Sequence, residues 1–181
     1  MMISGYKKRK NTEAQIKRIL IYSAILFLLS VAESSFFSSI KILPATPDLI
    51  LGAITIIALT DTRETTVIAA IIGGVMSDAI CGSGIYLSPL FYLAVALLLC
   101  PFAKKLMRSY LSWLALFPVA LIMRAIYTTG RAYLFYNGFD ILEVLQYAVL
   151  PEAICTAVFS LLLYPIVTGL ARIVKSRRDM S

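Results

Sequence analysis

The chain consists of long apolar runs separated by short polar breaks, and the runs are too long to be strands. Six apolar segments cover residues 16–40, 47–60, 65–81, 86–106, 111–136 and 141–173. A helix needs about 20 apolar residues to cross the ~30 Å hydrocarbon core of a bilayer. The pattern therefore predicts an all-α integral membrane protein with six transmembrane helices. The last segment is long enough for an interfacial piece before the span, with a kink expected at Pro151.

The second segment is unusual because it is short. Its 14 or so residues span roughly 21 Å at 1.5 Å per residue, which is less than the hydrocarbon core. We therefore expect its outer end to lie below the membrane surface, shielded by the rest of the protein. Thr46 is the predicted N-cap and Pro47 the first helical residue, and Asp48 is placed to stabilise the positive end of the helix dipole.

The positions of the basic residues predict the orientation in the membrane. Almost all of the 17 Lys and Arg residues lie in the N-terminal tail, in the loops after the second and fourth segments, and in the C-terminal tail. The positive-inside rule then places both termini in the cytoplasm. The expected organisation is a basic cytoplasmic tail at 1–15, a six-helix transmembrane domain at 16–173 and a second basic tail at 174–181. Recognition of nucleic acid or anionic lipid by these residues is the alternative reading, and we expect no nucleic-acid partner.

Composition narrows the function classes. Apolar residues make up 60% of the chain and charged residues 15%, with a mean hydropathy of +0.85, whereas soluble domains are about 45–50% apolar. The chain has no histidine, which excludes a Ser-His-Asp triad and a His-ligated zinc site. Cys81, Cys100 and Cys155 are far apart and are expected to act as small apolar residues. No catalytic residue, cofactor or metal site is predicted.

Charged residues inside the predicted spans are the main candidates for function. They are Glu33, Asp78, Arg124, Arg131 and Glu152. Such residues are costly in lipid and usually face a partner or a cavity, and their overlapping depth predicts an ion-paired network in the outer half of the bundle. Arg124, Thr128 and Arg131 follow i, i+4, i+7 spacing and so share one helix face. The network is either a polar pocket or relay, or a set of pairs that only fixes helix orientation; the second interpretation is preferred.

The third segment combines an aspartate with small residues. Ala70, Gly74 and Asp78 recur every four residues, and Ala69 and Gly73 form a parallel row. Small residues allow helix backbones to approach closely in a membrane. The rows predict tight packing within the bundle, and the alternative is a docking face for another membrane protein. Asp78 lies at the negative end of its helix dipole and is expected to need an arginine partner.

Aromatic residues near the ends of the spans are predicted to anchor the protein at the membrane interface. They are Tyr110, Trp113, Tyr133, Phe135, Tyr136 and Phe139. Trp113 is the single tryptophan of the chain.

One stretch of the chain resembles a known family. Pro47-Asp48-Leu49 opens an apolar helix, Gly74-x-x-x-Asp78-x-x-x-Gly82 follows, and then come Gly84 and a helix with Tyr92. This order is similar to that in the bacterial rod shape-determining MreD family, and the resemblance is strongest across residues 44–95. The family-like positions are Pro47, Asp48, Gly74, Asp78 and Gly82.

The resemblance implies a multi-pass protein of the bacterial cytoplasmic membrane with about six spans and no catalytic activity. It implies a role in the elongation machinery that builds lateral peptidoglycan and maintains cell shape. The implied partners are the single-pass membrane protein MreC and, indirectly, the MreB filament and the cell-wall synthases. The family also implies a bundle similar to the substrate-binding S-components of energy-coupling-factor transporters. The family-like positions would shape the outer part of the bundle and its partner-facing surface.

Two other classes of function remain to be compared. An S-component that binds a vitamin is the alternative, because it has a similar size and needs an outer polar pocket. Against it, the first segment has no clear Ala-x-x-x-Ala docking row, and the outer loops are short for lids. An intramembrane enzyme is disfavoured, because the chain has no Ser-Lys or paired-aspartate helix motif.

Overall fold

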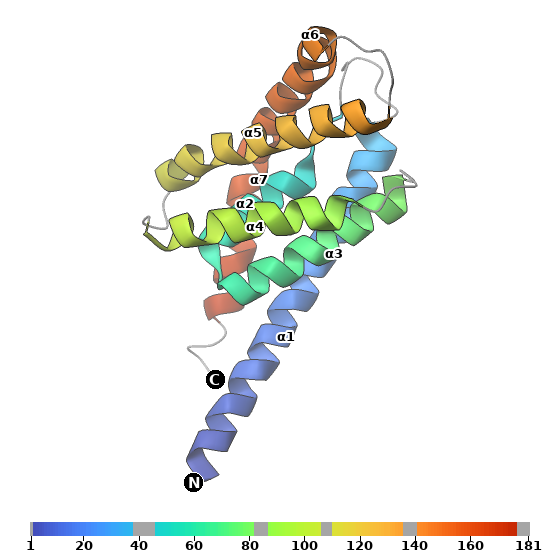
Figure 1. Cartoon of the computed structure of the whole chain (residues 1–181). Coiled ribbons are helices and arrows are strands. Elements are labelled where there is room, and N and C mark those ends of the chain that lie inside the picture. The colour runs from blue at the N-terminus through green and yellow to red at the C-terminus, as the bar shows by residue number, and fades with distance from the viewer. Residues whose placement is uncertain (1, 38–45, 82–86, 106–109, 136–140, 177–181) are drawn as a thin grey trace.

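The computed structural model describes residues 2–37, 46–81, 87–105, 110–135 and 141–176, and every regular element in these ranges is a helix. Six are 12 residues or longer: α1 (Met2–Val31), α2 (Leu49–Thr60), α3 (Arg63–Cys81), α4 (Ser88–Lys105), α5 (Tyr110–Phe135) and α7 (Leu150–Ser176) (Figure 1). The shorter elements are a π-helical turn η1 (Ala32–Phe37), the helix α6 (Ile141–Val144) and a second π-helical turn η2 (Leu145–Val149). The all-α prediction is confirmed.

Four helical stretches are long and apolar enough to cross a membrane. They are Gln15–Ser35, Ser88–Lys105, Tyr110–Leu134 and Leu142–Leu170. The helix α2 is too short to meet this criterion, and α3 is 19 residues long but includes Arg63, Glu64 and Asp78. The start of α1 and the end of α7 lie at the same end of the molecule (Figure 1). These features are compatible with a membrane protein.

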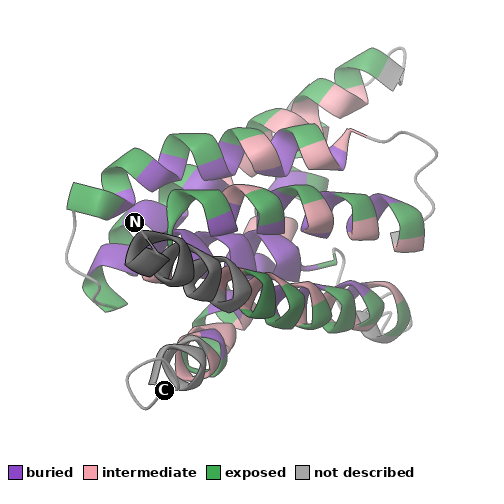
Figure 2. Ribbon diagram, turned by 90° about the horizontal axis from the view of Figure 1, so that it is seen from below, coloured by how far each residue is buried: buried purple, intermediate pink, exposed green. Residues whose placement is uncertain are grey.

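The short helix α2 is the core of the bundle. It packs against α1, α3, α4, α5 and α7, and all of its residues from Leu49 to Leu59 are buried. Figure 2 shows the buried residues in the interior of the bundle and the exposed residues on outward faces. At 1.5 Å per residue, the 12 residues of α2 span about 18 Å. The prediction that the rest of the protein shields this short helix is confirmed.

The first residue of α2 differs from the prediction. The N-cap is Asp48 rather than Thr46, because the Asp48 carboxylate accepts a hydrogen bond from the Leu51 N–H at 2.8 Å. Pro47 is buried ahead of the helix, whereas Thr46 is exposed. An aspartate caps a helix well because its charge also complements the positive end of the dipole.

The small residues of α3 are used for packing inside the chain. Ala69 and Ala70 are buried, and Gly74 lies against the first turn of α4. A Cβ on Gly74 would overlap the Pro89 backbone and lie 2.9 Å from the Ser88 carbonyl carbon. A Cβ on Gly73 would lie 3.0 Å from Ile50 Cγ2 of α2. The rows therefore allow α3 to approach its neighbours, as the packing interpretation predicts.

The chain changes helix type directly before Pro151. The N–H of Leu150 donates to the Leu145 carbonyl, an i→i−5 bond that ends the π-helical turn η2. A proline has no N–H, and its ring displaces the carbonyl four residues earlier. The irregularity expected at Pro151 thus takes the form of a π-helical turn.

The prediction that Trp113 anchors the chain at the membrane interface is wrong. Its side chain is fully buried, and its Nε1 donates to Thr55 Oγ1 at 3.1 Å. Its ring also packs against Phe117 and Tyr164, with centroids 4.8 and 5.3 Å away. The reason is helical phase: Trp113, Phe117 and Ala120 lie on the inner face of α5 and are all buried. A residue's position along the chain does not reveal which face it occupies.

Candidate functional site: a buried charge cluster at the start of α2

Asp48 is the centre of a buried polar cluster. Its side chain is fully buried. Besides capping α2, its carboxylate accepts hydrogen bonds from the Tyr92 hydroxyl of α4 at 2.9 Å and pairs with Arg124 Nη1 of α5 at 3.1 Å. Its backbone N–H donates to Thr156 Oγ1 of α7 at 2.9 Å. One residue thus links four helices at the start of α2.

Arg124 joins this aspartate to a second carboxylate. Its Nε donates to Glu152 Oε1 of α7 at 2.8 Å, and the hydroxyl of Thr128, one turn further along α5, donates to Glu152 Oε2 at 3.4 Å. The guanidinium therefore bridges Asp48 and Glu152. Bonds from an ionised donor to an ionised acceptor are roughly twice as strong as neutral ones.

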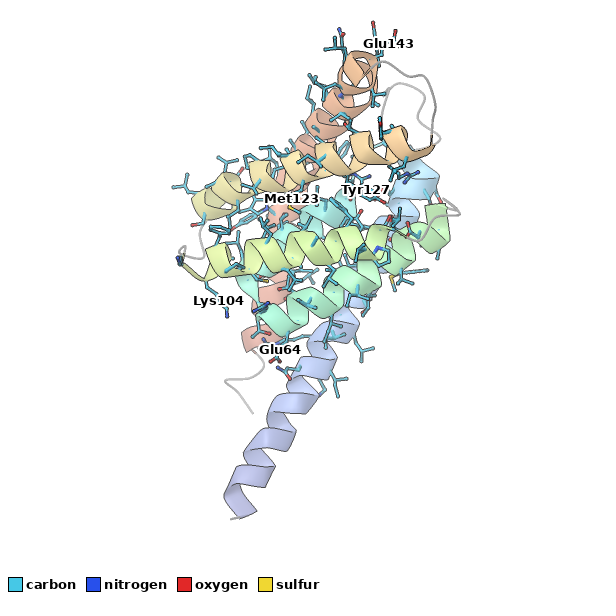
Figure 3. All side chains as sticks on the ribbon, in the orientation of Figure 1. Glu64, Lys104, Met123, Tyr127 and Glu143 are labelled. Carbon is cyan, nitrogen blue, oxygen red and sulfur yellow. The ribbon has the colours of Figure 1, made fainter. Side chains whose placement is uncertain are left out.

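Two aromatic rings cover the same guanidinium. Arg124 Cζ lies 5.6 Å from the ring centroids of both Phe91 and Tyr127. These two rings stack on each other with centroids 4.5 Å apart, and Tyr127 lies on the side of α5 that faces α4 (Figure 3). Ring faces attract a cation and replace part of its hydration. The arginine thus has both anionic and aromatic neighbours in the interior.

Glu33 approaches the cluster from η1. It is only 9% exposed, and it accepts a hydrogen bond from the backbone N–H of Leu49. It lies close enough to Asp48, Arg124 and Glu152 to interact with them electrostatically. Its Oε2 has no hydrogen-bond partner among the described residues. The cluster thus contains three carboxylates and one arginine.

The predicted five-residue network is only partly assembled. The structure brings Arg124 and Glu152 into contact and places Glu33 near them. Arg131 is partly exposed and forms no ion pair within the described part of the chain. Asp78 Oδ2 accepts from the Ser88 N–H at 3.1 Å and so caps α4. The positive end of α4 thus offsets the unfavourable dipole of α3, while Arg124 pairs with other carboxylates.

Sequence reasoning missed three members of the cluster. Asp48 was expected to stabilise a helix dipole and, as a family-like position, to shape the outer part of the bundle, but it was not expected to pair with a charge. Neither Tyr92 nor Thr156 was expected to bond to it. A usable signal was present, because an aspartate at the start of a largely apolar helix requires a cationic or hydroxyl partner inside the protein. Of the family-like positions, Pro47, Asp48, Gly74 and Asp78 lie near the helix starts described above, and Gly82 lies outside the described residues.

A second polar set lies at the other end of α2. Asp61 is the C-cap of this helix; Arg18 Nη1 contacts its Oδ1 at 3.0 Å and the Tyr22 hydroxyl donates to its Oδ2 at 3.1 Å. The side chain of Asp61 is 5% exposed. The sequence analysis placed only a loop with a basic residue here, whereas the structure shows a part-buried contact between α1 and the α2–α3 turn. Glu64, just beyond this turn, and Lys104 lie toward this end of the molecule, and Glu143 lies toward the other (Figure 3).

The polar side chains at the start of α2 form ion pairs and hydrogen bonds between helices. Within the described ranges, no group of three or more His, Cys, Asp or Glu side chains could hold a metal ion. Asp48, Arg124 and Glu152 satisfy one another at short distances. The cluster therefore holds α2, α4, α5 and α7 in a fixed relation.

Comparisons with protein-family models, with curated proteins and with solved structures found no match to this chain. Its function is therefore inferred from its own residues and contacts.

Proposed function

We propose that the chain is a non-enzymatic membrane scaffold of the MreD type. It would lie in the bacterial cytoplasmic membrane with six spans, α2 and α3 included, and with both termini in the cytoplasm. Its task would be to hold a single-pass protein of the MreC type. Through that partner it would connect to MreB and the synthases that build peptidoglycan during cell elongation.

The observation that carries this proposal is the structural linkage of the family-like residues. Asp48 caps α2 and accepts the hydroxyl of Tyr92 in α4. Asp78 caps α4 at Ser88, and Gly74 gives the first turn of α4 its close approach to α3. Residues of the resemblance thus fix the starts of two helices against each other. A rigid arrangement of helix ends suits a surface that holds a partner.

The distribution of charge supports a six-span arrangement. The helices α2 and α3 are joined by a turn at Asp61 and Thr62. If both helices cross the membrane, the chain leaves α3 on the same side of the membrane from which it entered α2. The start of α1 and the end of α7 lie at one end of the molecule (Figure 1), as is expected if both basic tails lie on the same side of the membrane under the positive-inside rule.

The pairing of the buried charges favours a scaffold over a vitamin-binding S-component. A ligand site must present polar groups that the empty protein leaves available. Here Arg124 is already bonded to Asp48 and Glu152, and Tyr92 is bonded to Asp48. A vitamin would have to displace these contacts.

The test is affinity purification of the tagged full chain from native bacterial membranes, with identification of the proteins that accompany it. We expect an MreC-type protein. Asp78→Ala should reduce its yield about fivefold and lower the melting temperature, because loss of an N-cap costs about 1 kcal/mol. The control is Glu143→Ala, since Glu143 is exposed.

Recovery of a transporter ATPase and its energising membrane subunit, without an MreC-type protein, would contradict the scaffold. Unchanged yield and unchanged melting temperature in Asp78→Ala would contradict the role assigned to Asp78.

A further inference from the structure

The charge cluster at the start of α2 has more acidic than basic side chains. Three carboxylates, those of Glu33, Asp48 and Glu152, lie near a single arginine, Arg124. Asp48 and Glu152 are each bonded to that arginine, so Glu33 is the carboxylate left without a cation among the described residues. Carboxylates that share a buried site repel one another unless a positive group separates them.

Glu33 also has an unused oxygen. It is more than nine-tenths buried, and its Oε2 has no hydrogen-bond partner in the described part of the chain. Buried polar groups are nearly always bonded, and an exception calls for a missing donor. The Glu33 carboxylate lies beside the cluster, because it accepts a hydrogen bond from the N–H of Leu49, the residue that follows Asp48.

We propose that this site binds a primary ammonium group at Glu33, most readily the headgroup of an ethanolamine phospholipid. The proposal does not depend on the scaffold function. The ammonium would supply both the missing donor and the missing positive charge. Its N–H would donate a hydrogen bond to Glu33 Oε2, and no covalent bond is made or broken in the process.

The geometry selects this class of cation. A metal ion is disfavoured, because the described residues contain no suitable group of three ligands. A guanidinium prefers two parallel bonds to one carboxylate, whereas Glu33 already accepts from the Leu49 N–H. An ammonium is a compact charge that can bond to a single oxygen.

The depth of Glu33 favours a lipid as the source of the ammonium. The apolar stretch through α1 and η1 runs from Gln15 to Ser35, so Glu33, in η1, lies at its end. The headgroup region of a bilayer begins where such a stretch ends. Ser34 and Ser35, which follow, are polar and partly or fully exposed.

The experiment compares full-length protein in two sets of nanodiscs. Both contain the same fraction of phosphatidylglycerol, and the remainder is either phosphatidylethanolamine or phosphatidylcholine, which differ in whether the ammonium carries N–H groups. Bound lipid is measured by native mass spectrometry, and unfolding by fluorescence of the buried, single Trp113. We expect about a tenfold preference for the ethanolamine lipid, as one charge-assisted bond provides, with a higher melting temperature.

Glu33→Gln should lose this preference, while Glu143→Gln, at an exposed carboxylate, should keep it. A second arm adds methylammonium or tetramethylammonium chloride to discs of phosphatidylcholine. Stabilisation by methylammonium without a lipid preference supports the ammonium site and assigns it to a free amine. The proposal is overturned if wild type responds to neither lipid nor methylammonium, or if Glu33→Gln responds as wild type does. If Glu33→Gln fails to fold, the responses of the wild-type protein to the two lipids and the two ammonium salts still decide whether the proposal holds.

Discussion

The two ends of α2 carry the same three residue types in different surroundings. At each end an aspartate accepts from an arginine and a tyrosine; the sets are Asp48, Arg124 and Tyr92 at the start, and Asp61, Arg18 and Tyr22 at the end. At the start the two partners come from α4 and α5. At the end both come from α1, one turn apart. The first set therefore ties several helices together, whereas the second fastens one helix.

The helix dipole acts on the two aspartates with opposite sign. Asp48 lies at the positive end of α2 and caps it, so its charge is favourable there even before it meets Arg124. Asp61 lies at the negative end of α2, where Arg18 and Tyr22 of α1 and the Thr62 N–H, which donates to Oδ1 at 2.8 Å, stabilise its charge. The start of α2 also has two further carboxylates, Glu33 and Glu152. The start of α2 thus has more carboxylates than its other end, and their stability there depends more on Arg124.

The sharpest test of this difference is Arg124→Gln. The change leaves the buried Asp48 and the partly buried Glu152 without their cation, and breaking a buried ion pair costs about 3–5 kcal/mol. The free energy of unfolding, followed by Trp113 fluorescence in denaturant, should fall by that amount. Arg131→Gln is the matched control on the same helix, and its effect should stay within about 0.5 kcal/mol. Equal losses in the two variants would show that the cluster does not hold the bundle.

Asparagine at each aspartate separates charge from capping. Asp48→Asn retains a good N-cap but weakens the bond to Arg124, and should cost about 2–3 kcal/mol. Asp61→Asn loses the pair with Arg18 and also removes a carboxylate from the negative end of the dipole. The two effects oppose each other, so its cost should be about 1 kcal/mol or less. Chemical unfolding of both variants measures this, and a larger loss at Asp61 would reverse our ranking of the two ends.

The packing behind the Asp48 end is tested by Gly74→Ala. The new Cβ would overlap the backbone of Pro89, and overpacking of this kind costs about 1–3 kcal/mol. Gly130→Ala is its control, because nothing lies within 4 Å of a Cβ there. That change should instead stabilise α5 by up to about 1 kcal/mol, as alanine favours helix. Melting temperatures should move in opposite directions, and a shared direction would exclude a tight α3–α4 contact.

The smallest expected effects are those of the two tyrosine hydroxyls. Tyr92→Phe and Tyr22→Phe each remove one hydrogen bond to an aspartate, at a cost of about 0.5–1.5 kcal/mol. Tyr92 should have the larger effect, because Asp48 is fully buried and water cannot replace the lost donor. The same unfolding assay compares them. Identical values would mean that both ends are equally open to water.

Regular structure followed from the sequence more reliably than contacts did. Apolar runs and their polar breaks predicted α2 to α5 to within a few residues; α3, for example, was expected at 65–81 and occupies Arg63–Cys81. The helix α1 differs, because it begins at Met2, well before the apolar run expected at 16–40. The burial of the short α2 also followed, because a helix that short cannot cross a membrane alone. Capping was misassigned at Thr46, since several nearby residues have side chains able to cap and only the backbone path selects among them.

The pairing of charges was less predictable because it depends on how helices rotate and cross. Arg124 and Glu152 were expected to meet, as two opposite charges at similar depth. Arg131 shares its helix face with Arg124 in a straight projection, yet it forms no ion pair within the described residues. Asp78 was expected to need an arginine, and it caps α4 in the structure. The depth of a residue in the membrane can be estimated from the sequence. Which residues pair also depends on how each helix is rotated and where the helices cross, and these are set by tertiary packing.

By itself, the sequence determined that the chain forms apolar helices, that one of them is too short to reach both membrane surfaces, and that charges lie inside them. The reason is local, since hydropathy and helix propensity act over one or two turns. Only the tertiary structure decided that Asp48 is the centre of the buried cluster, that Trp113 lies inside, and that Glu33 retains an unused oxygen. These outcomes depend on residues such as Thr156, more than 100 positions from Asp48, that are brought together only when the helices pack.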